Sequence, residues 1–186
     1  MNRALKFVAT VYDSTIPDSS DEPVSLSPNG ELNAEFVSDA NGLLKNYITA
    51  MDAVKLRSGL QIVMHVSARG NLYLQSSGLN KAMKPEIPKH CAQVAVRAIN
   101  LIYILSALVY PFMPSTSELV LRQLNAPARA MPGVLSIDVL SGHQIGTLEH
   151  LFKQIDEKMI EVYKGGIGVE EHEIHRGSGG DREGGR

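Results

Sequence analysis

Two stretches of this 186-residue sequence carry histidines at spacings that could support chemistry. In the stretch HEIH, His172 and His175 lie three residues apart, whereas the zinc-protease motif HExxH places its histidines four apart on one helical face. In the stretch SGHQIG, Ser141 precedes His143 by two residues, which allows a hydrolase hypothesis but supplies no carboxylate to orient the histidine. We therefore predict that this chain by itself holds no catalytic residue, metal ion or cofactor.

The bulk composition is that of a soluble globular domain. A single cysteine, Cys91, excludes an internal disulfide framework and any CxxC motif. Hydrophobic residues make up 44% and charged residues 20%, and the length suffices for one domain with a sizeable core. The first ten residues are too polar for a secretory signal, and the most apolar run, residues 101–113, is too short to span a bilayer. A cytoplasmic protein without a membrane partner is expected.

The charges are unevenly distributed along the chain. Residues 12–52 contain eight acidic residues and one lysine, whereas residues 53–97 contain seven basic residues and one glutamate. A chain with a net charge of −2 can therefore still present a basic face to a nucleic acid. Pairing between the two segments, with the remaining charges in water, is the plainer explanation.

Apolar residues recur at helical spacing in five segments of the sequence. These segments are residues 2–12, 32–51, 53–76, 89–110 and 115–124. From Val94 onward the fourth segment is apolar nearly all round, interrupted by Arg97 and Asn100, so it is expected at the centre of a helical bundle.

The boundaries and faces of these helices follow from local signals. Asp52 is expected to cap the helix 53–76, and Ser115 or Ser117, with Glu118, to begin the helix 115–124. The predicted buried face of the helix 53–76 consists of Leu56, Leu60, Val63 and Leu74, with His65 packed beside it. Gly70, in the stretch SARGNLYLQ, costs about 1 kcal/mol relative to alanine, and Gly42 weakens the preceding helix in the same way.

The remaining segments contain little regular structure. Residues 77–88 are expected to form a loop because they contain Gly78, Pro85 and Pro88. After residue 125 a loop with one short extended piece is expected to fold back on the bundle, followed by a last helix over 153–163. The glycine-rich residues 165–186 are predicted to be disordered. The fold class is thus all-α, with a bundle of about five helices over 1–164 and a separate tail.

Three stretches together resemble a known family. They are DAVKLRSGLQIVMHVSARGNLYLQ (52–75), AINLIYILSALVYPFMPSTSELVLRQLN (98–125) and LSGHQIGTLEHLFKQIDEK (140–158). In order and spacing they are similar to the anticodon-binding domain of eukaryotic, fungal-like methionyl-tRNA synthetases, with the class I helical-bundle fold. The resemblance covers about residues 1–164. It implies a module that docks the anticodon stem-loop of methionine tRNA and reads its CAU bases.

The resemblance also implies positions for RNA contacts. The family's first motif is Asn-x-x-x-Arg, and Arg3 matches the arginine, whereas the asparagine would precede the first residue of this chain. The second contact is an aromatic residue nine positions after the asparagine of GN. Counting from Asn71 reaches Asn80, preceded by Leu79. The chain contains no tryptophan, so stacking on a base would fall to Leu79 or to the amide of Asn80.

Lysines flank the same loop. Lys81 and Lys84, followed by Lys89, could hold phosphates of the RNA, although solvated surface lysines are an equal alternative. The resemblance further implies that Gly70 and Asn71 serve close packing and local bonding.

The family's catalytic domain, with its sites for ATP and methionine, has no counterpart in this sequence. The expected partners are therefore methionine tRNA and the catalytic domain of the parent synthetase. A tRNA-independent protein-interaction bundle using the acidic segment 13–39, or a non-functional gene fragment, remains an alternative.

Overall fold

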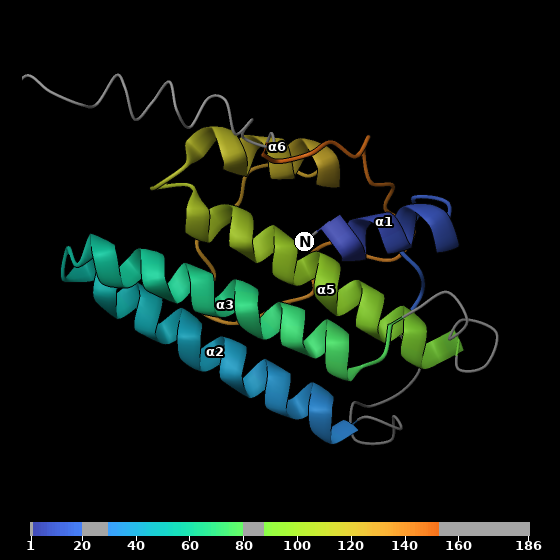
Figure 1. Ribbon diagram of the computed structural model, residues 1–186, viewed down its shortest axis with the longest axis horizontal. Coiled ribbons are helices and arrows are strands. Elements are labelled where there is room, and N and C mark those ends of the chain that lie inside the picture. The colour runs from blue at the N-terminus through green and yellow to red at the C-terminus, as the bar shows by residue number, and fades with distance from the viewer. Residues whose placement is uncertain (1, 20–29, 80–87, 153–186) are drawn as a thin grey trace, which may run out of the picture. The chain divides into compact units, whose positions relative to one another are not determined.

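The computed structural model describes residues 2–19, 30–79 and 88–152. The chain divides into two units, residues 1–151 and residues 152–186. Helices, and no strands, form the regular structure of the described residues, which confirms the all-α prediction (Figure 1). The helices are α1 (Asn2–Val11), α2 (Gly30–Asp52), α3 (Leu56–Ser76), α5 (Pro88–Val109) and α6 (Pro114–Leu124).

Helix α5 forms the centre of the core, as its sequence predicts. It packs against α1, α3 and α6, while α2 packs on α3 (Figure 1). By length and composition α5 could cross a membrane, with a mean hydropathy of 1.7, but 89% of that apolar window is buried inside the protein. Burial on all sides by neighbouring helices explains why the helix lacks a polar face.

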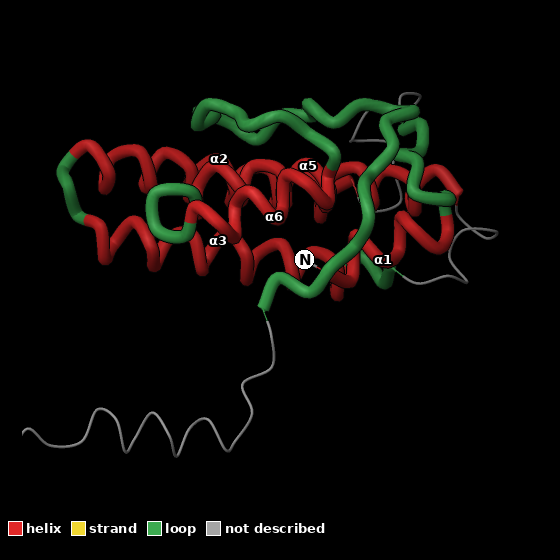
Figure 2. The backbone as a smooth tube through the Cα atoms, turned by 90° about the horizontal axis from the view of Figure 1, so that it is seen from above, coloured by secondary structure: helices red, strands yellow, loops and turns green. Residues whose placement is uncertain are grey.

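The polar exceptions on α5 have structural roles. Asn100 is fully buried, and its side-chain oxygen accepts hydrogen bonds from the backbone N–H groups of Asp138 (2.7 Å) and Val139 (2.8 Å). Its amide nitrogen donates to the carbonyls of Val96 and Val139. This residue therefore anchors the C-terminal loop, which runs beside α2 and α5 before it crosses to α1 (Figure 2). The predicted folding-back of the loop is confirmed.

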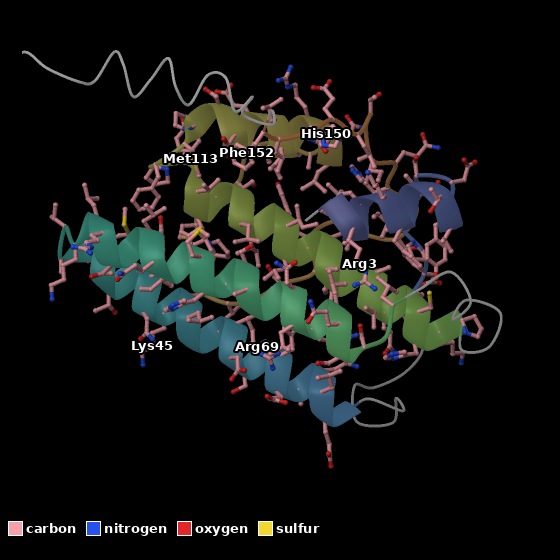
Figure 3. The ribbon with its side chains drawn as sticks, viewed as in Figure 1. Arg3, Lys45, Arg69, Met113, His150 and Phe152 are labelled. Carbon is pink, nitrogen blue, oxygen red and sulfur yellow. The ribbon has the colours of Figure 1, made fainter. Side chains whose placement is uncertain are left out.

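Helices α2 and α3 are joined by an aromatic pair and an ion-pair cluster. The rings of Phe36 and Tyr73 stack with centroids 4.2 Å apart, and the Tyr73 hydroxyl donates to Asn33 Oδ1 at 2.6 Å. The Arg69 guanidinium lies between the helices and pairs with Asp39 (2.6 Å) and with Glu35 (3.2 Å) (Figure 3).

This cluster bears on the uneven distribution of charge. Both carboxylates belong to the acidic segment and the arginine to the basic one. Charge pairing between the two segments, the plainer explanation of their composition, is therefore present in the fold.

The start of α3 differs from the prediction. Asp52 is the last residue of α2, and Lys55 occupies the position before the first residue of α3 without a capping side-chain bond. Between them Val54 adopts a left-handed conformation with φ of 56°, which separates the two helices. The turn falls here because Val54 N–H and Lys55 N–H bond back to carbonyls of Met51 and Ala50.

The buried face of α3 also differs in part. Val63 and Leu74 are buried as predicted, but Leu56 and Leu60 are exposed, and so is His65. Helices α2 and α5 pack on other faces of α3, so the apolar residues at the start of α3 are not part of the core.

The start of α6 requires a similar correction. Pro114, not Ser115 or Ser117, is its first residue, because proline lacks the N–H group that the first turn leaves unpaired. Ser117 is instead buried, and its hydroxyl donates to the Ser106 carbonyl of α5 at 2.8 Å.

The predicted short extended piece is a β-bridge between the two ends of the first unit. Thr15 pairs with Gln144 in an antiparallel bridge, Ile16 N–H donates to the His143 carbonyl, and Ile145 N–H donates to the Ser14 carbonyl. The predicted helix 153–163 and the tail 165–186 lie outside the described residues.

Candidate nucleic-acid interface

The C-terminal end of α3 turns the chain toward the candidate site. Gly78 has a φ of 66°, a left-handed value that glycine adopts without steric cost, and its N–H donates to the Gln75 carbonyl at 3.1 Å. The Ser77 hydroxyl bonds to the Leu74 carbonyl. A glycine followed by a buried apolar residue is a common helix ending, and here it places Leu79 in the core with 2% of its surface exposed.

Arg3 meets this turn from α1. Its Nη2 atom donates to the Leu79 carbonyl oxygen at 3.0 Å, while the residue as a whole is exposed. The bond follows from the packing of α1, since Ala4, Leu5 and Val8 are buried and the polar positions face outward (Figure 3). A guanidinium carries five N–H donors, so one bond to a carbonyl orients the group and leaves it capacity for a phosphate or a base.

The structure thus brings together two of the five sequence-predicted contact residues. Arg3 and Leu79 are in contact through the backbone of Leu79. The Leu79 side chain is packed in the core and does not offer a stacking surface in this arrangement. Asn80, Lys81 and Lys84 lie outside the described residues. The RNA contacts of all five residues stay a prediction.

Further exposed polar side chains, which were not predicted to contact RNA, lie on α1 and on the C-terminal half of α3. Lys6 is exposed three positions after Arg3, and on a helix this spacing places both cations on one face. On α3, Asn71 and Gln75 are exposed four residues apart. The exposure of Lys6 could have been predicted from the sequence, because it occupies a polar position between the buried residues of α1.

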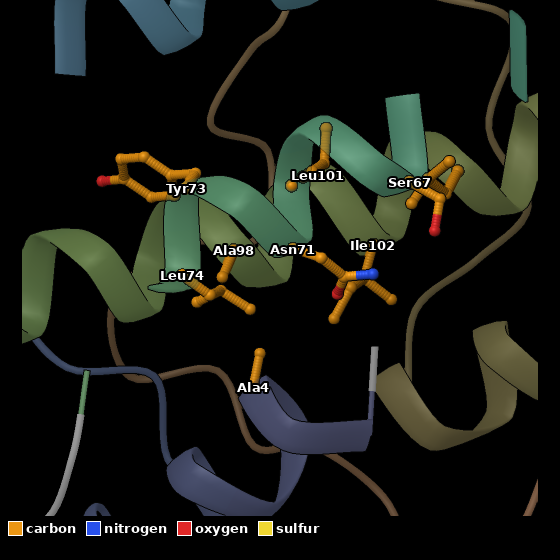
Figure 4. Close-up of a pocket in the computed structure, with 10 residues that line it drawn as sticks. Ala4, Ser67, Asn71, Tyr73, Leu74, Ala98, Leu101 and Ile102 are labelled. Carbon is orange, nitrogen blue, oxygen red and sulfur yellow. The ribbon is translucent and has the colours of Figure 1, made fainter. Parts of the chain in front are cut away.

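The space between α1, α3 and α5 is too small for a base. A cavity of about 20 Å³, enough for one water molecule, is lined by residues that include Ala4, Asn71 and Ile102 (Figure 4). Gly70 allows the close approach of α3 to α5, since a Cβ atom at this position would collide with Leu101. A base that approaches this region would therefore lie outside this cavity.

The start of α5 carries buried polar groups close to the end of α3. His90 and Gln93 are buried. Burial lowers the pKa of His90, and the positive charge of Arg97 lowers it further, while a hydrogen bond with the Ser77 backbone opposes the shift. A neutral His90 at physiological pH fits this environment. The same burial raises the pKa of the Tyr73 hydroxyl, which keeps it a donor to Asn33.

The stretch SGHQIG has a structural explanation. His143 Nε2 lies 2.7 Å from the Leu124 carbonyl, one of the carbonyls that the C-terminus of α6 leaves unpaired. Gly146 N–H bonds to the Gln123 carbonyl, and a Cβ atom on Gly146 would approach the Arg122 carbonyl oxygen to 2.5 Å. The stretch therefore caps α6 and docks on it. Within the described residues no group of three or more histidine, cysteine or acidic side chains could hold a metal ion.

Comparisons with known proteins point to one family. A family model described as the anticodon binding domain of methionyl tRNA ligase matches residues 25–170. The chain is 46% identical over 169 residues to a probable cytoplasmic methionine–tRNA ligase of Schizosaccharomyces pombe, covering 90% of this chain and 21% of the relative. It is 34% identical over 168 residues to the cytoplasmic methionine–tRNA ligase of Saccharomyces cerevisiae, covering 90% of this chain and 22% of that relative.

A solved structure shares the fold. The apo form of Mycobacterium tuberculosis methionyl-tRNA synthetase superposes with a TM-score of 0.69 at 18% identity, covering 83% of this chain and 31% of that protein. The chain spans about a fifth of the length of the curated relatives it matches.

Proposed function

Since the chain belongs to the family of the anticodon binding domain of methionyl tRNA ligase, we propose that it binds the anticodon stem-loop of methionine tRNA and reads its CAU bases. The observation that carries this proposal is the contact between Arg3 and the Leu79 carbonyl, which presents an exposed guanidinium at the turn after α3. Single-stranded RNA loops are recognised by hydrogen bonds and by stacking on flat groups, and a guanidinium plane supplies both.

The exposed face of α1 suits the backbone of the stem-loop. In this proposal Arg3 contacts the anticodon loop, and Lys6, one turn further along α1, neutralises a neighbouring phosphate. Asn80 would supply an amide plane, and Lys81 and Lys84 further phosphate contacts. Leu79 would contribute through its carbonyl rather than by stacking.

The ligase reaction itself belongs to the remainder of the relatives' length. We expect ATP and methionine to bind that catalytic portion, with this chain contributing tRNA recognition only. The relatives' names place them in the cytoplasm, and the proposal assigns this chain to the same compartment, without a membrane partner.

Fluorescence anisotropy with labelled methionine tRNA tests the proposal. The 186-residue chain is expected to bind methionine tRNA more tightly than the same tRNA with an altered anticodon, at each salt concentration of a titration. Arg3→Ala should weaken binding and reduce this preference with little change in melting temperature. Lys6→Ala should weaken binding to both tRNAs equally and lower the salt slope by about 1, because one phosphate contact is lost.

The matched control is Lys45→Ala, since Lys45 is an exposed lysine on α2, away from α1 (Figure 3). Equal binding of both tRNAs by the unmodified chain, across the titration, would refute anticodon reading.

A further inference from the structure

A turn of residues 77–79 follows α3 and presents the Leu79 carbonyl to Arg3. We call it the α3 turn. The Ser77 N–H group donates to the Tyr73 carbonyl at 2.9 Å. Because α3 ends before Ser77, no helical N–H group pairs with the Ser77 carbonyl. Ser77 is buried, and a buried carbonyl needs a hydrogen-bond partner, so that partner must come from another element.

His90 supplies this partner from α5. It lies in the first turn of α5, which packs on α3, and it is buried. Burial lowers the pKa of His90, and a hydrogen bond with the Ser77 backbone opposes the lowering. A hydrogen bond that raises the pKa of a histidine is one that its own N–H group donates, and the Ser77 N–H group is already paired with Tyr73. The imidazole therefore donates to the Ser77 carbonyl.

Two carbonyl groups of the α3 turn thus have partners in different helices. The Ser77 carbonyl accepts from His90 in the core. The Leu79 carbonyl accepts from Arg3 Nη2 at 3.0 Å at the surface. Only Gly78 separates the two residues, and it has a left-handed conformation with φ of 66°. A rotation that turns the Ser77 carbonyl toward water would therefore also move the Leu79 carbonyl away from Arg3.

We propose that His90 is a positioning residue for anticodon reading, which holds the α3 turn so that the Leu79 carbonyl orients the Arg3 guanidinium. This role rests on the proposed function, in which Arg3 contacts the anticodon loop. His90 is buried and acts through one hydrogen bond, without a contact of its own to the RNA. A replacement side chain that keeps an N–H donor at this position should therefore hold the turn equally well.

The test compares His90→Gln with His90→Met. Glutamine and methionine have side chains of similar length and flexibility, but only glutamine carries N–H groups that can donate to the Ser77 carbonyl. Gln93→Met is the matched control on the next turn of α5. Gln93 is also buried, and its side-chain oxygen has no hydrogen-bond partner among the described residues, so this substitution leaves the α3 turn intact.

Amide hydrogen exchange, followed by NMR on the chain without RNA, measures how firmly the α3 turn is held. Loss of the bond should accelerate exchange of the Ser77 amide about tenfold in His90→Met. His90→Gln and Gln93→Met should change this rate only slightly. The buried Val63 amide in the middle of α3 is the internal reference, because a general loss of stability would accelerate its exchange as well.

Fluorescence anisotropy with methionine tRNA measures the consequence for recognition. His90→Met should raise Kd about fivefold, roughly the effect of one lost hydrogen bond, whereas His90→Gln should keep the Kd of the unmodified chain. In an Arg3→Ala background, His90→Met should leave Kd nearly unchanged, because His90 acts through Arg3. A role of His90 in stability alone would not depend on the residue at position 3.

Three results would overturn this assignment. The first is equal exchange of the Ser77 amide in His90→Met and His90→Gln. The second is faster exchange in His90→Met that the Val63 amide matches. The third is a loss of tRNA affinity in His90→Met that is equally large in the Arg3→Ala background. Equal binding of methionine tRNA and of the same tRNA with an altered anticodon would instead refute the proposed function, and the exchange rates would then still decide whether His90 holds the α3 turn.

Discussion

The substitution Asn100→Leu tests whether the C-terminal loop is held by a single buried side chain. Leucine keeps the number and branching of the side-chain heavy atoms of asparagine, with bulkier methyl groups, but removes both its donor and its acceptor. Of the four groups that the Asn100 side chain contacts, the Val96 carbonyl keeps its hydrogen bond within the helix. The other three belong to the loop and lose their partner: the N–H groups of Asp138 and Val139 and the carbonyl of Val139.

The expected loss follows from the burial of these groups. Val139 is buried, and each unsatisfied buried backbone group costs about 1–3 kcal/mol. Asp138 is exposed, so its N–H group can bond to water instead. Two groups at about 1–3 kcal/mol, reduced by partial relaxation of the loop, give a loss of about 2–4 kcal/mol in the free energy of unfolding. For a domain of ordinary stability, about 5–15 kcal/mol, that is a large fraction.

Urea denaturation followed by circular dichroism measures this loss through the transition midpoint. Asn46→Ala serves as the control, because Asn46 is an exposed asparagine of α2 and its replacement should not destabilise the protein. A change below about 0.5 kcal/mol in Asn100→Leu, within the ordinary range of surface substitutions, would refute the assignment of Asn100 as the anchor of the loop.

The other predictions concern glycines and pH. Gly42→Ala should raise the free energy of unfolding by about 0.5–1 kcal/mol, since no atom beyond the neighbouring helix backbone lies within 4 Å of the added methyl group. Gly70→Ala should instead lower the free energy of unfolding by about 1–3 kcal/mol through overpacking against Leu101. Urea titration measures both changes, and equal effects would contradict the packing. His90 has a lowered pKa when folded, so the unfolded chain binds the proton more readily. Stability should therefore fall as the pH drops below the unfolded pKa of about 6.5, and His90→Gln should flatten this dependence in melts between about pH 7 and pH 5.

The helices of this fold could be predicted because periodicity is a local property of the sequence. The central position of α5 follows from its composition, and Asn100 is visible as an interruption of it. The start of α3 could not be predicted in the same way. Leu56 and Leu60 have the spacing of a core face, and only the placement of α2 and α5 decides that they are exposed.

Contacts between residues far apart in the chain could not be predicted from local sequence patterns. The role of His143 depends on the Leu124 carbonyl, and the pairing of Thr15 with Gln144 joins residues at the two ends of the first unit. In the candidate site, Arg3 was identified through a family resemblance. Its partner at Leu79 is a backbone oxygen, which any residue type could supply, so the sequence did not reveal it.

The bridge between Thr15 and Gln144 has a consequence for the order in which the protein folds. Within this chain α1 is made before the other helices, but the residues that pair with the segment after it are made almost last among those of the first unit. Contacts between distant parts of a chain form slowly, because the loop between them must close first. The helix pair α2–α3 can form early from local contacts, whereas residues 14–16 become fixed only after residues 142–145 have emerged. Thr15 is thus synthesised before the helices α2 to α6 and reaches its partner, Gln144, only after all of them have been made.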